Sequence, residues 1–215
     1  MKQYPRIGYF DESLIGQYCY AFDKLDGSNI RLEFSKKKGW YKFGTRNEII
    51  SNLNSQFGKS IDLFIDKYGN DLEEIFKSDK QYRNSIGFVA FAEYFGTNSF
   101  AGQHKDEKMD IKLFDISQYK RGLVPPKEFI EKFGHLDIPD LVYQGDYNLD
   151  MISTIRNNKL GLKEGVVIKG VYKTKGNDIV WMSKVKTNDW LLKIKEKFGE
   201  KALLEELNGN KSLLV

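Results

Sequence analysis

The chain has 215 residues, of which 40% are hydrophobic and 30% are charged, and this balance describes one globular domain or a domain with a small appendage. Its single cysteine, Cys19, excludes a disulfide scaffold within the chain and indicates a reducing, cytoplasmic location. No segment has the length and hydrophobicity of a membrane span, so we expect no membrane partner. The net charge of +4 permits contact with nucleic acid without arguing for it.

Residues 20–30 hold the stretch around which the other patterns are arranged. Lys24 comes at the end of a predicted half-buried strand, and the tight polar turn Asp26-Gly27-Ser28-Asn29 follows it. A lysine amine in such a place can act as a nucleophile once it loses its proton, which burial and neighbouring cations favour. A surface lysine beside a turn would give the same pattern, so this stretch alone leaves both interpretations open.

Alternating apolar and polar residues predict a strand over 29–34 and a returning strand over 40–45, joined by a lysine-rich turn. The returning strand leads into Arg46, whose guanidinium would then come back beside Lys24. Guanidinium groups bind phosphate through two parallel hydrogen bonds. The next segment, 60–76, has helical spacing that we expect to be interrupted near Gly69.

An almost uninterrupted apolar run over 86–96 predicts a buried strand that carries one carboxylate, Glu93. Glutamate is rarely buried without a partner, so Glu93 belongs either to a structural ion pair or to a site where it accepts a ligand hydroxyl. A further strand is predicted over 109–116, with Phe114 and Asp115 near its end.

Two histidines, His104 and His135, are isolated from other metal-ligating residues, and no zinc-site spacing occurs. Helices are predicted over 127–133 and 149–157, whereas 136–147 carries no clear pattern.

Residues 163–170 form a β-branched segment that predicts a strand with Glu164 at its start and Lys169 near its far end. After a turn at 175–178, a pairing strand is predicted over 179–186.

Lys184 and Lys186 lie two residues apart on this last strand and therefore share one face. Two like charges on one face repel each other unless an anion lies between them, which favours a phosphate site. An exposed edge strand protected by lysines is the alternative. Beyond Lys186 we expect a short helix whose apolar stripe packs on the body, formed by Trp190, Leu191, Ile194 and Phe198.

The motifs K-x-D-G-x-N, E-Y-F-G, L-F-D, E-G-V-V-I-K and K-V-K follow one another in this order between Lys24 and Lys186. The set resembles the motifs of covalent nucleotidyltransferases, which are the ATP-dependent polynucleotide ligases and mRNA capping enzymes. The branch it resembles most is that of the nick-sealing RNA ligases, because Asn29 stands where DNA ligases and capping enzymes usually have arginine.

The resemblance implies an α+β adenylyltransferase domain of the ATP-grasp-like ligase type over residues 1–186. Antiparallel sheets would form a central nucleotide groove flanked by helices, with no OB-fold. Residues 187–215 would be a short helical tail packed on the same domain. Relatives add an OB-fold or a helical domain, for which this tail has no room. We therefore expect a separate substrate-binding protein, or the lysine-rich tail itself, to help grip the RNA.

The resemblance also implies an ATP-dependent RNA ligase that joins 3′-hydroxyl and 5′-phosphate ends of RNA or of a nicked duplex. Lys24 would be the nucleophile that carries AMP covalently, and Lys184 and Lys186 would stabilise the charge of the transition state. The AMP would then pass to a 5′-phosphate, and a 3′-hydroxyl would displace it.

The remaining site residues take their expected roles from the same resemblance. Asp26 and Asn29 would organise the loop around the nucleophile, and Arg46 would hold the ribose and phosphate side of AMP. The other implied contacts are Glu93 to a ribose hydroxyl, Phe114 to adenine, Lys169 to the phosphates, and Glu164 with Asp115 to Mg²⁺ or Mn²⁺. A small ATP-dependent DNA ligase, a module that binds nucleotide or RNA ends without turnover, and an enzyme that transfers AMP to a protein remain open alternatives.

Overall fold

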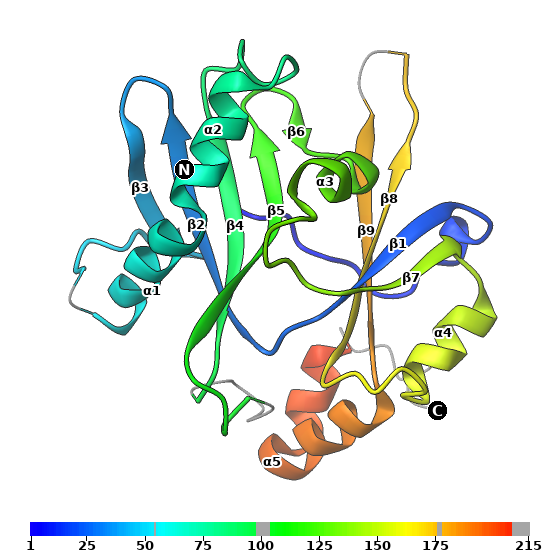
Figure 1. The fold of residues 1–215 in the computed structure, drawn as a ribbon. Helices are drawn as coiled ribbons and strands as arrows, with labels where there is room; N and C mark the ends of the chain where they lie inside the picture. Colours follow the sequence, from blue (N-terminus) through cyan, green and yellow to red (C-terminus); the bar gives the residue numbers. More distant parts are fainter. Residues whose placement is uncertain (54, 98–103, 176–177, 208–215) are drawn as a thin grey trace.

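Two antiparallel sheets form the frame of the protein in the computed structural model, which describes residues 1–53, 55–97, 104–175 and 178–207 (Figure 1). One sheet has the order β7-β1-β8-β9 and the other has the order β3-β2-β4-β5-β6, so neither closes into a barrel. The first contains β1 (Tyr18–Asp23), β7 (Leu141–Asp146), β8 (Gly165–Tyr172) and β9 (Ile179–Lys186). The second contains β2 (Gly27–Ser35), β3 (Gly39–Thr45), β4 (Phe88–Phe95), β5 (Asp110–Gln118) and β6 (Gly122–Leu123). The expected α+β fold with antiparallel sheets is confirmed.

The larger sheet is covered on one face by helices α1 (Gln56–Phe64), α2 (Asn70–Ser78) and α3 (Pro126–Phe133), which enclose an aromatic core with Phe34, Phe76 and Phe133. The interruption expected near Gly69 occurs as a change of helix type and does not break the helical backbone. The chain stays helical there and passes through a π-helical turn over Ile65–Gly69, with Gly69 at φ −54° and ψ −49°. A glycine in a helix weakens it without ending it when packing holds the backbone.

The smaller sheet packs against α4 (Leu149–Arg156), and α5 (Asn188–Glu206) follows its last strand. The backbone of α5 bends at Gly199, where φ is +83°. Trp190, Leu191 and Ile194 are buried as expected, but Phe198 is 39% exposed, so the apolar stripe does not extend to it. The bend instead brings Leu203 and Leu207 against the stripe.

Strand β7 lies in the segment for which the sequence showed no pattern. It is an edge strand paired only with β1 among the described strands, and its residues are mostly exposed or half-buried, so no strict alternation is required of it. Cys19 is buried on β1, and burial raises the pKa of its thiol to about 12. The predicted turn at 175–178 includes residues 176–177, which lie outside the described residues. Within the described chain, no helix is both long and apolar enough to cross a membrane.

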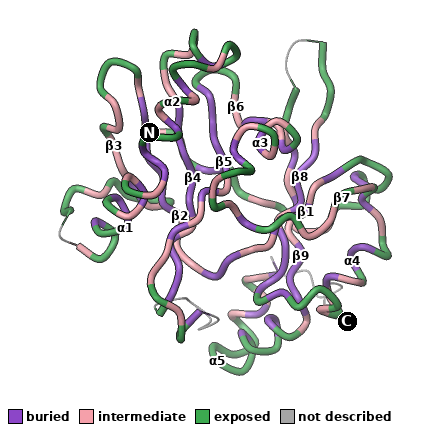
Figure 2. The backbone as a smooth tube through the Cα atoms, viewed as in Figure 1, coloured by how far each residue is buried: buried purple, intermediate pink, exposed green. Residues whose placement is uncertain are grey.

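Residues 1–9 form a strap that crosses from one sheet to the other. Arg31 of β2 donates a hydrogen bond to the Lys2 carbonyl (3.1 Å), and the Tyr4 hydroxyl donates to Asp115 of β5 (2.5 Å). At the far end, the backbone N–H of Lys184 on β9 donates to the Gly8 carbonyl (2.8 Å). Figure 2 shows buried backbone running through the central strands of both sheets, which the strap ties together.

Candidate active site

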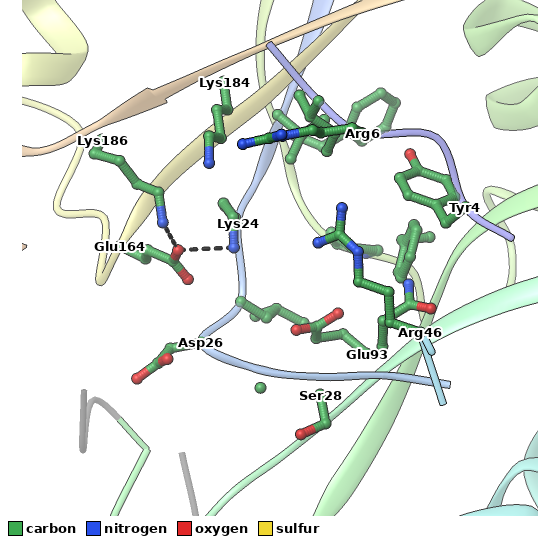
Figure 3. Close-up of a pocket in the computed structure, with 18 of the residues that line it drawn as sticks. Tyr4, Arg6, Lys24, Asp26, Ser28, Arg46, Glu93, Glu164, Lys184 and Lys186 are labelled. Atoms are coloured by element: carbon green, nitrogen blue, oxygen red, sulfur yellow. Dashed lines mark hydrogen bonds and ion pairs between the residues drawn. The ribbon is translucent and has the colours of Figure 1, made fainter. Parts of the chain in front are cut away.

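The predicted nucleophile lies where the two sheets meet. The short loop that holds Lys24 leaves β1 in one sheet and enters β2 in the other. The start of this loop is held in place because the backbone N–H of Lys24 donates a hydrogen bond to the Gly165 carbonyl of β8 (2.9 Å). A cavity of about 890 Å³ opens at this place, lined by residues of both sheets, the strap and α5 (Figure 3). Its volume suits a nucleotide-sized ligand.

Lys24, Glu164 and Lys186 meet at one end of the smaller sheet. The Lys24 amine lies 2.7 Å from Glu164 Oε1, and the same oxygen accepts a hydrogen bond from Lys186. The register of β8 and β9 pairs Gly165 with Lys186, which places Glu164 beside that lysine. Glutamate 164 is 2% exposed, and its Oε2 has no hydrogen-bond partner in the described part of the chain.

Lys184 and Lys186 face the cavity side by side, as their spacing predicted. Burial lowers the pKa of Lys186 well below its ordinary value, and the charge of Lys24 lowers it further, while Glu206 opposes this. Burial also lowers the pKa of Lys184, again against Glu206. Three lysine amines thus converge on one cavity, which favours an anionic ligand.

Asn29 and Glu93 line the opposite side of the cavity. They are directly paired across β2 and β4, so their side chains share one face. Burial raises the pKa of Glu93 to about 7, although Lys24 and the N–H of Gly27 act in the opposite direction. Among the described residues, Glu93 is in no ion pair, and Asn29 Oδ1 lacks a hydrogen-bond partner. Both groups are therefore available as acceptors for a ligand.

A β-bulge decides where Phe114 and Asp115 point. The register between β4 and β5 shifts after Phe91, which pairs with Asp115, so that Phe114 is the extra residue. Phe114 is half-buried and lines the cavity, whereas Asp115 is 1% exposed and does not line it.

Asp115 instead forms a buried ion pair with Lys169 (2.8 Å) and accepts from Tyr4. Burial raises the pKa of Asp115 and lowers the pKa of Lys169, and each partner opposes the shift of the other. The Lys169 amine also donates to the Phe114 carbonyl (2.8 Å). Lys169 lines the cavity, but its amine is engaged with this pair and so holds Phe114 rather than facing open space.

Asp26 and Arg46 complete the predicted set at the cavity. Arg46 is exposed directly after β3, and Figure 3 shows its guanidinium turned into the cavity on the side of Lys24. The cavity is also lined by residues that were not predicted as site residues, and Tyr4, Arg6, Tyr9 and Glu206 are among them. The first three belong to the strap, and the last belongs to α5. No sequence pattern around these four residues indicates a site, because only tertiary contacts bring them to the cavity.

The described residues contain no group of three or more His, Cys, Asp or Glu side chains arranged to hold a metal ion. Magnesium, however, commonly uses one or two protein carboxylates and takes its other ligands from phosphate and water. The unpartnered Oε2 of Glu164 fits such a site. Asp115 does not, because Lys169 and Tyr4 engage its carboxylate away from the cavity.

Comparison with known proteins identifies the family of this chain. A family model described as RNA ligase matches residues 17–186. The chain belongs to the RNA ligase family. The match starts just before β1 and ends with β9, so the whole strap and all of α5 lie outside it. None of the curated proteins matches the sequence.

Solved structures of RNA ligases share the fold. A Naegleria gruberi RNA ligase with PPi has a TM-score of 0.63 and 17% identity, covering 92% of this chain and 59% of that one. A mutant of the same ligase with ATP and Mn has a TM-score of 0.61 and 18% identity, covering 91% of this chain and 61% of that one. An archaeal ATP-dependent RNA ligase has a TM-score of 0.60 and 16% identity, covering 90% and 50%. The chain thus spans between half and about three fifths of the length of these ligases.

Proposed function

We propose that this chain carries out the nucleotidyl-transfer chemistry of an ATP-dependent RNA ligase, with Lys24 as the nucleophile. The observation that carries the proposal is that the Lys24 amine lies 2.7 Å from Glu164, beside Lys186, and lines a cavity of about 890 Å³. The amine attacks the α-phosphate of ATP, a nitrogen–phosphorus bond forms, and pyrophosphate leaves with the electrons of the broken phosphorus–oxygen bond.

Neighbouring groups supply what this step needs. Glu164 lies within hydrogen-bonding distance of the amine and is placed to accept the proton that Lys24 must lose. Lys184 and Lys186 place positive charge where negative charge builds up on the phosphate. Glu164 Oε2 is the atom through which a bound Mg²⁺ or Mn²⁺ would be held, and such an ion would neutralise phosphate charge.

The opposite wall of the cavity suits the nucleoside. Phe114 presents a ring for stacking on adenine, and Glu93 and Asn29 present acceptors for ribose hydroxyls. Arg46 contributes a guanidinium for the phosphate side. In the proposed sequence of reactions, AMP then passes from Lys24 to the 5′-phosphate of an RNA end, and a 3′-hydroxyl displaces it to seal the strand. A separate protein that helps bind RNA and a cytoplasmic location are part of this proposal.

Labelling with α-³²P-ATP and Mg²⁺ tests the first step. We expect a covalent label on the intact protein that mass mapping places on Lys24. The Lys24→Ala variant should show no label, whereas Lys127→Ala, which removes a 74% exposed lysine on α3, should label as the unaltered protein does. A label that persists in Lys24→Ala would refute the mechanism.

Sealing of nicked duplexes made of RNA, DNA or both tests the substrate. Ligation at an RNA 3′-hydroxyl is expected. Ligation restricted to DNA ends would indicate a small DNA ligase instead. Tight ATP binding without any covalent label would indicate a binding module.

A further inference from the structure

The carboxylate of Glu206, near the end of α5, sits among positively charged groups of the cavity. Its Oε1 accepts a hydrogen bond from the Tyr9 hydroxyl (2.9 Å) and lies 3.2 Å from the Lys184 amine and 3.4 Å from the Lys186 amine. Burial alone would raise the pKa of Glu206, but the two lysines lower it below its usual value. An anion is therefore well held at this position, and a side chain of the protein occupies it.

Arg6 lines the same cavity as Glu206, Tyr9 and Lys184. Its positive charge opposes the rise in the pKa of Tyr9 that burial and Glu206 cause. Figure 3 shows its guanidinium directed toward the Lys184 amine. Tyr4 on one side and the bond from Lys184 to Gly8 on the other fix the strap around Arg6. The strap therefore brings the Tyr9 hydroxyl to the position that Glu206 fills and the Arg6 guanidinium to the neighbouring Lys184, in the same cavity.

The position of the Glu206 carboxylate adjoins the Lys24 amine on the side away from Glu93 and Asn29, which would bind the ribose. Lys186 contacts both Glu164, the partner of Lys24, and Glu206. In Figure 3, Lys24 lies between Lys184 and Glu93. With the ribose at Glu93 and the α-phosphate at Lys24, the phosphate chain continues toward Lys184, Tyr9 and Arg6.

We propose that Arg6, Tyr9 and Lys184 form a subsite for the β- and γ-phosphates of ATP, and that Glu206 occupies this subsite until ATP displaces its carboxylate. The inference rests on the proposed function, because it takes the nucleotide to bind with its α-phosphate at Lys24. The terminal phosphates carry more negative charge and more acceptor oxygens than one carboxylate, so they compete for the same donors. Two of the three subsite residues lie outside the range matched by the family model.

Calorimetric binding of α,β-methylene-ATP, which cannot transfer AMP, and of AMP tests the subsite. Arg6→Gln and Tyr9→Phe should each weaken binding of the triphosphate analogue about tenfold or more, because each removes a hydrogen bond to a charged group, and should leave AMP binding nearly unchanged. Glu206→Gln should tighten analogue binding roughly two- to fivefold, since it removes a partly exposed competing ion pair. Inorganic pyrophosphate should follow the pattern of the analogue.

Two matched variants control for changes elsewhere. Glu200→Gln alters an exposed glutamate of α5, the helix that carries Glu206. Arg83→Gln alters an exposed arginine that does not line the cavity. Neither variant should change the binding of either nucleotide. Thermal unfolding of each variant shows whether it folds, and the opposite signs expected for Glu206→Gln and Arg6→Gln separate a binding effect from general destabilisation.

Equal effects of Arg6→Gln and Tyr9→Phe on the analogue and on AMP, or no effect on either, would overturn the subsite. The subsite would also be overturned if Arg6→Gln and Tyr9→Phe weakened only the binding of 5′-phosphorylated RNA and not that of 5′-hydroxyl RNA. The phosphate bound by these residues would then belong to the RNA. These measurements involve no covalent step. Failure of the subsite with intact labelling of Lys24, or the reverse, therefore shows which of the two proposals is wrong.

Discussion

Replacing Glu93 by Gln should stabilise the nucleotide-free protein above neutral pH. The pKa of Glu93 rises from 4.5 to about 7, chiefly because of burial, so the folded protein holds this proton more tightly than the unfolded chain does. The Glu93 carboxyl therefore contributes favourably to the free energy of unfolding at low pH, and this contribution is lost as the pH rises from 4.5 through 7. The full loss corresponds to about 3 kcal/mol. Gln keeps an oxygen that can accept from the N–H of Gly27 but does not ionise.

Urea unfolding of the unaltered protein and of Glu93→Gln, measured at pH 5 and at pH 8, checks this reasoning. The advantage of the variant should be larger at pH 8 than at pH 5 by about 2 to 3 kcal/mol. Taking the difference between the two proteins at each pH cancels the titration of all other groups. An advantage that is the same at both pH values, or that shrinks as pH rises, would refute the assignment of a raised pKa to Glu93.

Three further changes have expected outcomes. In the unaltered protein, binding of the triphosphate analogue should weaken up to roughly tenfold as pH falls from 8 to 6, because Glu93 loses its charge, whereas binding by Glu93→Gln should be much less sensitive to pH. Tyr4→Phe removes the hydroxyl that donates to buried Asp115 and should lower the free energy of unfolding by about 1.5–3 kcal/mol; a change near zero would show that this bond is unimportant. Gly165→Ala should destabilise the fold by roughly 1–3 kcal/mol or more, because φ is +153° and a Cβ would lie 2.1 Å from the Val185 carbonyl oxygen. An unchanged free energy of unfolding would contradict this expectation.

The sequence predicted those parts of the site whose positions depend on local patterns. Alternation of apolar and polar residues placed the strands of the β2–β3 hairpin, and an almost uninterrupted apolar run placed β4. The spacing of Lys184 and Lys186 set them on one face of β9. Local strand patterns placed Lys24 and Glu164 at strand ends, and in the structure the Lys24 amine lies 2.7 Å from Glu164 Oε1. These features follow from strand geometry and need little information from distant residues.

Other parts of the site depend on contacts between residues far apart in the chain. The bulge in β5 turns Asp115 toward Lys169 and Tyr4, which a regular two-residue alternation does not predict. Glu206 enters the cavity because of where α5 packs, and hydrogen bonds to β9 and β5 carry Arg6 and Tyr9 there on the strap. The sequence alone thus determined most of the strand pattern and singled out Lys24 as the proposed nucleophile. Only the tertiary structure decided which charges surround that nucleophile, because long-range packing and register, rather than local propensity, position those side chains.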